Sequence, residues 1–338
     1  MTIKIGINGM GRIGRMLVRS IIENQKKNFK ISHINNRSNA EVTYKLIKYD
    51  SIHGKFNADL RLDENELIIN KNKITFSQES KIENIDWKKY DVDYVFECTG
   101  KFNSKEKLLI HIKNGAKKVI VSAPCKNADK TIVFGVNENL YDPSKHNIVT
   151  AASCTTNCLA PIVSVIHKNF EILKGQITTI HNPTNTNVLL DKPHKDFRRA
   201  RSTMLSMHPT STGSAKAIGL IFPELKGKLD GHAVRVPVIN SSLTDCVFQL
   251  NKKTTINEVN ELFEQASKSD LKGILGIEFK PLVSIDFLND TRSSIVDADS
   301  TLITDNNLLK VYSWYDNETG YACRMIDLAE MVCKSLNV

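Results

Sequence analysis

The sequence predicts an α/β protein with two domains: a doubly wound, mostly parallel sheet, followed by an α+β domain with an antiparallel sheet. In the first half, short apolar runs alternate with helix-like stretches, which is the pattern of βαβ units. After residue 154, β-branched runs follow one another with turn-like separations. The length of 338 residues suits two cores, because domains most often hold about 100 to 200 residues.

The first half contains a series of strand candidates. The chain opens with Ile3, Ile5 and Ile7 on one face of a strand, followed by a glycine-rich turn and a stretch with helical spacing. A second apolar run stops at Asn35 and Asn36. Later strand candidates are 94–97, 119–122 and 148–151, and a helix candidate over 104–114 separates the first two.

The second half changes in character. An apolar helical stretch covers 159–166, and the strand candidates that follow are 177–180, 233–238 and 243–250. The final stretch, 321–335, is amphipathic, and we expect it to pack back on the first domain. The predicted boundaries are 1–153 for the first domain, 154–318 for the second and 319–338 for the returning helix.

Composition excludes several classes of protein. Charged residues make up 25% and hydrophobic residues 41%, which is typical of a globular protein rather than a disordered one. The N-terminus lacks the apolar core of a signal peptide, and no apolar run approaches the roughly 18 residues of a membrane span. The seven cysteines are scattered and show no zinc spacing, so we expect reduced thiols, no metal and a cytoplasmic protein.

The net charge of +9 has more than one interpretation. It is compatible with a solvated basic surface, with a groove for anionic small molecules, or with a nucleic-acid surface. Basic residues do not interleave with aromatic ones as stacking platforms, and aromatics total only 7%. We therefore expect no nucleic-acid partner and no membrane partner.

A glycine motif links the first strand to the first helix. Gly9, Gly11 and Gly14 form a GxGxxG pattern, in which glycines permit a tight turn and let a pyrophosphate reach the positive end of the helix. Such a motif alone also occurs in incidental turns. Its position between a strand and a helix of a βαβ unit favours a Rossmann-type NAD(P)-binding domain.

Asn36 stands at the end of the second strand, where an acidic residue normally accepts the adenosine ribose hydroxyls. A carboxylate repels a 2′-phosphate, whereas Asn is neutral and the neighbouring Arg37 is able to pair with that phosphate. Either the protein uses NADP, alone or beside NAD, or Asn36 binds the ribose and Arg37 faces solvent. The sequence leaves both readings open.

Cys154 is the candidate nucleophile. It follows a strand and starts a helix, where the helix dipole stabilises a thiolate and where the Ser and Thr hydroxyls beside it are able to bind an anion. The alternative is a buried apolar thiol, which is the role expected for Cys158 one turn further on. A nucleophilic thiol needs a base, and sequence spacing does not choose among the histidines. His181 ranks first, because it ends a strand; the other candidates are His194, His208 and His232.

Motifs throughout the chain resemble the phosphorylating glyceraldehyde-3-phosphate dehydrogenase family. They are 7–15, 152–157, 194–201, 227–229, 235–237 and 314–318. The resemblance implies that Cys154 is the nucleophile and His181 the base. It also implies a hemithioacetal, then a thioester after hydride loss to the nicotinamide, and finally attack of inorganic phosphate to release an acyl phosphate.

The same resemblance implies ligand-binding residues. It implies that Thr184 and Arg235 bind the phosphate of glyceraldehyde 3-phosphate. It implies that the attacking phosphate is bound by Ser153, Thr155, Thr212 and Gly213, and that Arg199 contacts the same anion site. The cofactor contacts are Gly9, Gly11, Arg12, Ile13, Asn36, Ser80, Ser122 and Asn317. The segment 183–202 resembles the S-shaped loop that completes a neighbour's cofactor pocket in the family's tetramers, so a homotetramer is expected.

The departures from the family pattern affect residues expected to bind the cofactor more than residues expected to take part in catalysis. Asn36 replaces the acid, and Ser80 stands where an arginine near the adenine is usual; Met10 and Thr319 replace aromatic residues. The thiol, the base and the phosphate ligands match. NAD or NADP is the expected cofactor.

Three alternatives stay open at this point. Segments 182–186, 211–215, 231–235 and 240–248 resemble the variants encoded beside arsenate-resistance transporters, in which arsenate replaces phosphate and 1-arseno-3-phosphoglycerate is exported. An erythrose-4-phosphate dehydrogenase, whose acyl-enzyme is hydrolysed by water, is the nearest other enzyme. An RNA-binding protein that uses the dinucleotide groove is the alternative from another class.

Overall fold

The computed structural model describes residues 2–24, 28–64 and 66–334. Contacts divide the chain into two compact units: Met1–Ser153 with Ala322–Val338, and Cys154–Tyr321. Within the described residues, no helix is both long enough and apolar enough to cross a membrane.

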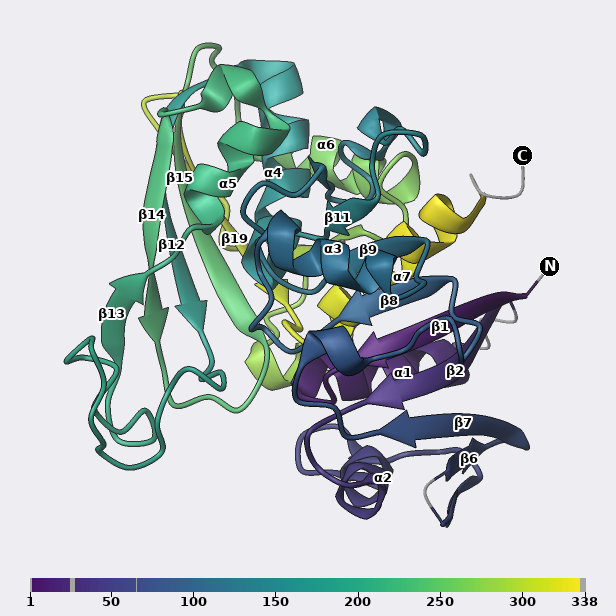
Figure 1. Ribbon diagram of the computed structural model, residues 1–338. Coiled ribbons are helices and arrows are strands. Elements are labelled where there is room, and N and C mark those ends of the chain that lie inside the picture. The colour runs from purple at the N-terminus through teal and green to yellow at the C-terminus, as the bar shows by residue number, and fades with distance from the viewer. Residues whose placement is uncertain (1, 25–27, 65, 335–338) are drawn as a thin grey trace. The chain divides into compact units, whose positions relative to one another are not determined.

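The first unit is built on a nine-stranded sheet in the order β10-β11-β9-β8-β1-β2-β7-β6-β5 (Figure 1). Neighbours from β10 to β7 are parallel, whereas β7, β6 and β5 form an antiparallel edge. The strands are β1 (Ile3–Asn8), β2 (Phe29–Asn35), β5 (Leu60–Asp63), β6 (Glu66–Ile69), β7 (Asn72–Ser77), β8 (Tyr94–Glu97), β9 (Lys118–Val121), β10 (Lys130–Thr131) and β11 (Ile148–Thr150).

The helices of this unit connect the parallel strands. They are α1 (Arg12–Glu23), α2 (Ala40–Lys48) and α3 (Lys105–Lys113). A small hairpin, β3 (Tyr49–Asp50) with β4 (Gly54–Lys55), follows α2. Every residue of β8, β9 and β11 is buried, which is typical of a parallel sheet covered on both faces. The predicted doubly wound sheet is therefore confirmed.

The second unit holds an eight-stranded sheet in the order β13-β14-β12-β15-β19-β17-β16, with β18 paired to β19. The strands are β12 (Ile172–His181), β13 (His208–Ser211), β14 (Leu229–Arg235), β15 (Ser242–Leu250), β16 (Leu275–Glu278), β17 (Ser294–Asp297), β18 (Leu302–Thr304) and β19 (Leu308–Tyr315). Its helices are α4 (Cys154–Phe170), α5 (Ser214–Ile221) and α6 (Ile256–Lys268), and α4 and α5 lie together beside the sheet in Figure 1.

The sheet of the second unit is mixed rather than purely antiparallel as expected. The pairs β12 with β14 and β16 with β17 are parallel, and the other pairs are antiparallel. Strand β14 returns parallel to β12 because β13 and α5 intervene between them. The apolar pattern of the sequence predicts neither β13 nor α5. Alternating burial along β15 fits one covered face and one less covered face.

Helix α7 (Thr319–Lys334) closes the chain, and residues 335–338 of the predicted C-terminal helix lie outside the described part. From Ala322 onward it belongs to the first unit, three residues later than the expected change at 319. The Tyr94 hydroxyl of β8 donates to the Val332 carbonyl at 3.2 Å, so this helix packs on the first unit.

Side-chain caps define the starts of two helices that the apolar pattern did not predict. Asn39 caps α2 by accepting from the Val42 amide at 2.9 Å, and Thr255 caps α6 by accepting from the Glu258 amide at 3.3 Å. Both helices are strongly amphipathic and partly exposed, so their apolar residues are few. Three-residue to four-residue 3₁₀ turns occur at Ile82–Asn84, Glu138–Leu140, Pro223–Leu225 and Ser284–Phe287.

Candidate active site

The glycine turn between β1 and α1 is tightly packed on one side and open on the other. Gly9 has φ +97°, and a Cβ on Gly14 would lie 2.1 Å from the Gly9 carbonyl oxygen. A Cβ on Gly11, by contrast, would meet nothing within 4 Å. Only glycine allows the close approach of helix to turn, and the open space at Gly11 is the cradle that a pyrophosphate needs.

The amino end of α1 suits an anion. Gly11 caps the helix without a side-chain hydrogen bond, and the first turn holds no acidic residue to offset the positive end of the dipole. Together with the open space at Gly11, this geometry fits the pyrophosphate of a dinucleotide.

The Arg12 side chain binds the carboxylate of Asp50. Its guanidinium forms a two-pronged pair with Asp50, in which Nη2 donates to Oδ1 at 3.0 Å and Nη1 makes a shorter contact with Oδ2. Burial acts to raise the pKa of Asp50, but Arg12 and the amides of His53 and Ile52 hold it well below its usual range. Any contribution of Arg12 to the predicted pyrophosphate contact therefore comes from its backbone.

The other predicted cofactor residues of the first unit lie at the carboxyl edge of the same sheet. Asn36 follows β2, Ser80 follows β7 and Ser122 follows β9, while Ile13 lies in the first turn of α1. Because these strands are parallel members of one sheet, the topology brings their carboxyl ends to one edge, where ligands bind in doubly wound folds. Ser80 is exposed and Ser122 is half-buried.

The Asn36 carboxamide is held by the protein itself. Its Oδ1 accepts from the Met10 amide at 3.3 Å, and its Nδ2 donates to the Thr43 hydroxyl at 3.2 Å. The neighbouring Arg37 is exposed. The end of β2 is therefore neutral at Asn36, and the long cationic side chain of Arg37 lies beside it. Neither residue repels a 2′-phosphate.

A buried carboxylate that the sequence analysis missed supports this edge. Glu97, 1% exposed at the end of β8, accepts from Asn8 Nδ2 at 2.7 Å and from the Thr99 amide at 2.8 Å. The indole of Trp87 can only donate, so His111 accepts it through Nδ1 and donates through Nε2 to Glu97 at 3.0 Å. The network fixes the loop that packs against Gly9. No local sequence pattern signals it, because its members are distant in the chain.

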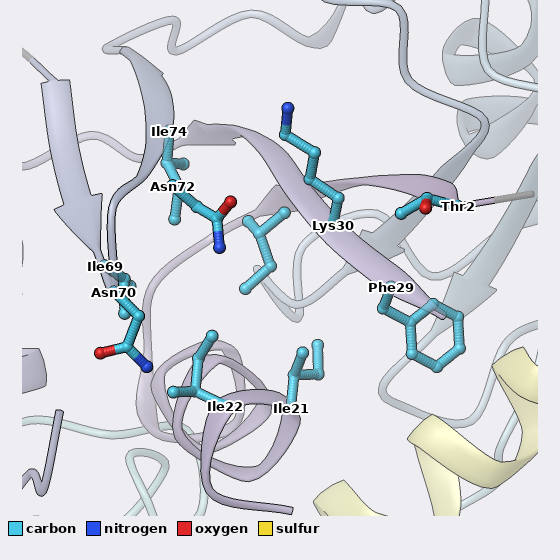
Figure 2. Close-up of a pocket in the computed structure, with 10 residues that line it drawn as sticks. Thr2, Ile21, Ile22, Phe29, Lys30, Ile69, Asn70, Asn72 and Ile74 are labelled. Atoms are coloured by element: carbon cyan, nitrogen blue, oxygen red, sulfur yellow. The ribbon is translucent and has the colours of Figure 1, made fainter. Parts of the chain in front are cut away.

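A hollow with a cavity volume of about 520 Å³ lies elsewhere on the first unit (Figure 2). Ile21 and Ile22 of α1, Phe29 of β2 and Ile74 of β7 line it, with polar residues such as Lys30 at its margin. It lies at the amino ends of the strands, on the edge opposite Gly9, so it is not the dinucleotide site.

In the second unit, the structure brings the candidate nucleophile and base together. Cys154 is the first residue of α4, and its Sγ lies 3.6 Å from Nε2 of His181 at the end of β12. The Nδ1 of His181 lies 2.8 Å from the Asn182 carbonyl, and Arg235 Nη1 donates to the same carbonyl at 2.7 Å. In the tautomer with Nδ1–H donating to that carbonyl, Nε2 is an acceptor for the thiol proton. Arg235 Nη1, which also lies 2.8 Å from Nδ1, then donates to the carbonyl and not to the protonated Nδ1.

Burial governs the resting protonation of this pair. It raises the pKa of the Cys154 thiol, and the Arg235 charge and the Thr155 amide oppose this only in part. Burial and Arg235 lower the pKa of His181 to about 3. The thiol and the imidazole are both neutral at rest, so the expected stabilisation of the thiolate by the helix start is outweighed by burial.

Tyr315 orders the surroundings of the pair, although the sequence analysis gave it no role. Its hydroxyl lies 2.8 Å from Thr155 Oγ1 and 2.8 Å from Thr179 Oγ1. Its ring meets the His181 ring edge-on, with centroids 6.0 Å apart. Burial alternates along β19 and places Tyr315 on the covered face of the strand.

The predicted anion-binding residues fall into separate local groups. Arg199 donates from Nε to Thr210 Oγ1 at 2.8 Å and from Nη1 to Thr186 Oγ1 at 3.5 Å. Thr186 in turn lies 3.1 Å from the hydroxyl of the exposed Thr184. Arg199 therefore links the Thr184 loop to β13.

The remaining predicted residues sit at element ends. Thr212 accepts from the Ser214 amide at 3.2 Å, and Gly213 caps α5 without a side-chain hydrogen bond. Asn317 is buried after β19, and the Ser242 hydroxyl lies within hydrogen-bonding distance of both Asn317 and Asn182. Ser153 is the last residue of the first unit before Cys154.

Metal chemistry has no support among the described residues. No group of three or more His, Cys, Asp or Glu side chains is placed to hold a metal ion there. All seven cysteines are free thiols.

A dinucleotide-binding unit followed in the same chain by a thiol and imidazole pair beside an arginine is the arrangement of a cofactor-dependent oxidoreductase. Two family models match the sequence. The NAD binding domain of glyceraldehyde 3-phosphate dehydrogenase matches residues 3–105, and the C-terminal domain matches residues 153–317. The chain belongs to the glyceraldehyde-3-phosphate dehydrogenase family.

Relatives match nearly the whole chain. Glyceraldehyde-3-phosphate dehydrogenase 3 of Nostoc sp. is 50% identical over 338 residues, covering 99% of this chain and 100% of that protein. The enzyme of Geobacillus stearothermophilus is 47% identical over 332 residues, covering 98% of both chains. Glyceraldehyde-3-phosphate dehydrogenase 1 of Bacillus subtilis is 46% identical over 334 residues, covering 99% of both. The predicted family is thus confirmed, and the enzyme is an NAD(P)-dependent oxidoreductase.

Proposed function

We propose that this chain oxidises D-glyceraldehyde 3-phosphate, with NAD or NADP and inorganic phosphate, to 1,3-bisphosphoglycerate through a thioester on Cys154. The distance of 3.6 Å between Cys154 Sγ and His181 Nε2, with Arg235 beside them, carries the proposal. The names of the relatives that match nearly the full chain support the same substrate.

The first step is attack of the Cys154 sulfur on the aldehyde carbon. His181 Nε2 takes the thiol proton and passes it to the carbonyl oxygen, which gives a hemithioacetal with a new C–S bond. Because both groups are neutral at rest, proton transfer accompanies the attack instead of preceding it.

Oxidation then converts the hemithioacetal to a thioester. The nicotinamide, when bound, supplies the hydride acceptor. His181 takes the hydroxyl proton of the hemithioacetal as the hydride leaves, so a C=O bond replaces the O–H bond and the C–H bond. The adjacent Arg235 lowers the pKa of His181, which destabilises the resulting imidazolium and favours release of that proton in the final step.

Inorganic phosphate closes the cycle. A phosphate oxygen attacks the thioester carbon, the C–S bond breaks, and the thiolate takes the proton held by His181. We assign the attacking phosphate to Ser153, Thr155, Thr212, Gly213 and Arg199, and the substrate phosphate to Thr184 and Arg235. Charge-assisted hydrogen bonds from Arg and hydroxyl donors suit such oxyanions. We assign Asn317 to the nicotinamide carboxamide.

The test is substitution of the nucleophile with a matched cysteine control. Cys154→Ser should lower phosphate-dependent NAD reduction by at least about 10³-fold, because a hydroxyl is a far weaker nucleophile than a thiol. Cys158→Ser, one turn along the same helix, should retain wild-type activity. Full activity in Cys154→Ser would contradict the mechanism, and a rate independent of phosphate would favour the erythrose-4-phosphate reaction.

Arsenate as the physiological acceptor is a second candidate, favoured by the sequence segments at 182–186 and 211–215. Arsenate and phosphate share tetrahedral shape and charge, so the same donors bind both. A kinetic comparison at equal concentration tests the idea: a lower KM for arsenate than for phosphate supports it, and an equal or higher KM opposes it.

We further propose a cytoplasmic homotetramer. The seven free thiols favour a reducing compartment. The segment that includes the predicted S-shaped loop exposes large apolar side chains, namely Leu189, Leu190, Phe197, Met204, Leu205 and Met207, each at least 53% exposed. Such clusters mark protein interfaces, and a second copy of this chain is the partner that the family resemblance implies.

A further inference from the structure

Three neighbouring strands place three basic side chains in one row. His181 of β12 is paired with Arg235 of β14, and Arg235 is paired with His208 of β13. Residues paired across adjacent strands point to the same face of a sheet, with Cβ atoms about 5 Å apart. His208 therefore lies on the face that carries His181 and Arg235, one strand beyond Arg235.

The His208 ring is buried, and it makes no hydrogen bond to the described residues. It is 6% exposed, and within the described part of the chain neither Nδ1 nor Nε2 has a partner. Both ring nitrogens of the neighbouring His181 are engaged. Buried polar groups are almost always hydrogen-bonded, so the two ring nitrogens of His208 are available to a ligand.

Arg235, beside His208 in the same row, also has a nitrogen without a hydrogen-bond partner in the described chain. Its Nε is also buried without a partner among the described residues, although Nη1 is bonded to Asn182. Thr210, which shares the covered face of β13 with His208, holds Arg199 through Nε at 2.8 Å. The ring nitrogens of His208 and the Nε of Arg235, unpartnered in the part of the chain that the structure describes, thus lie near a second guanidinium, that of Arg199.

The surrounding charges define the ligand. Arg235 faces His208 from β14, and Arg198, Arg199 and Asp196 face it from the segment before β13. Burial and Arg235 lower the pKa of His208, so the ring is neutral and offers one N–H donor and one acceptor nitrogen. A phosphate that keeps one proton has acceptor oxygens and one O–H donor, which complements a neutral imidazole beside guanidinium groups.

We propose that His208 is a further oxyanion-binding residue of this active site, which contacts a phosphate group together with Arg235. The inference rests on the proposed function, because it assigns His208 to one of the two phosphate groups of that reaction. The shared chemistry is a tetrahedral oxyanion, and its source is either glyceraldehyde 3-phosphate or inorganic phosphate.

The experiment compares two substitutions of His208 with a control. His208→Val removes both nitrogens and suits a strand, whereas His208→Gln keeps a donor and an acceptor. His232→Val is the matched control, since His232 lies on β14 three residues before Arg235, on the opposite face, and is exposed. Steady-state rates are measured with each of the two phosphates varied in turn.

His208→Val should raise the KM for one of the two phosphates about 10-fold, as expected for loss of a hydrogen bond to a charged group, with a smaller change in kcat. His208→Gln should fall between Val and wild type, and His232→Val should match wild type. A rise confined to inorganic phosphate assigns His208 to the attacking anion, and a rise confined to glyceraldehyde 3-phosphate assigns it to the substrate. Both KM values within about twofold of wild type would overturn the proposal.

A binding readout separates this proposal from the proposed function. Inorganic phosphate should raise the Tm of the wild type more than that of His208→Val, because a ligand stabilises only the state that binds it. Without phosphate, His208→Val should be at least as stable as the wild type, since an apolar side chain replaces an unsatisfied polar one. Equal phosphate-induced shifts in both proteins would contradict a role in binding. An inactive wild type that still shows the difference would refute the proposed function alone.

Discussion

Arg235 Nη1 lies 2.8 Å from His181 Nδ1, so the cation that is assigned to the substrate phosphate also touches the catalytic base. The same charge lowers the pKa of His181 and partly offsets the effect of burial on the pKa of Cys154. In the proposed mechanism, substrate anchoring and the reactivity of the thiol therefore depend on one side chain.

Arg235→Gln should move the reactivity of Cys154 to higher pH. Arg235 lowers the pKa of the thiol, so its removal raises that pKa, and a smaller fraction is thiolate at any given pH. The rate of alkylation by iodoacetamide, measured between pH 7 and pH 10, should rise along a curve displaced toward alkali. The kcat/KM should also fall by at least about 10-fold through the lost anion contact. A curve displaced toward acid would show that the electrostatic assignment is wrong.

Two glycines of the first turn should respond in opposite ways to alanine. Gly14→Ala places a Cβ 2.1 Å from the Gly9 carbonyl, so calorimetry should show a loss of about 2 kcal/mol or more. Gly11→Ala meets nothing within 4 Å, so its Tm should stay close to wild type while the Kd for NAD rises. Unchanged NAD affinity in Gly11→Ala would mean that the pyrophosphate does not use this cradle.

Asn36→Asp should discriminate between the two cofactors. A carboxylate at this position repels the 2′-phosphate of NADP and accepts from the ribose of NAD. We expect kcat/KM with NADP to fall by about 10-fold or more and that with NAD to change little. Arg37→Gln should lower only the NADP value. A strong NAD preference in the wild type would remove the hypothesis of NADP use before any variant is made.

A charge within the exposed apolar segment should disrupt the proposed tetramer. Leu205 is 85% exposed, and Leu205→Lys places a cation where we expect a second copy to pack. Light scattering should then report a smaller particle than the wild type at the same concentration. Leu220→Lys on α5, where the native side chain is 65% exposed, serves as the control and should leave the mass unchanged. A wild type that is monomeric would exclude the assembly altogether.

The strand, turn and helix at the start of the chain could be predicted because their signals are local. Alternating isoleucines, a glycine pattern and helical spacing all fall within about 20 residues of one another. The same holds for Cys154, whose position at a helix start is visible from its immediate neighbours. The long connection 49–77 and helices α2, α5 and α6 escaped prediction, because short strands and partly exposed helices carry few apolar residues.

The sequence by itself determined the doubly wound first unit, the family and the candidate nucleophile, since each depends on residues close together in the chain. Tertiary structure alone decided that Arg12 binds Asp50 and that Tyr315 and Glu97 support the two sites. It also placed His181, which the family resemblance implied, within 3.6 Å of Cys154. Arg235 reaches His181 across 54 residues, and Asn8 reaches Glu97 across 89. Contacts of this kind follow from strand register and sheet order, and no short-range pattern encodes them.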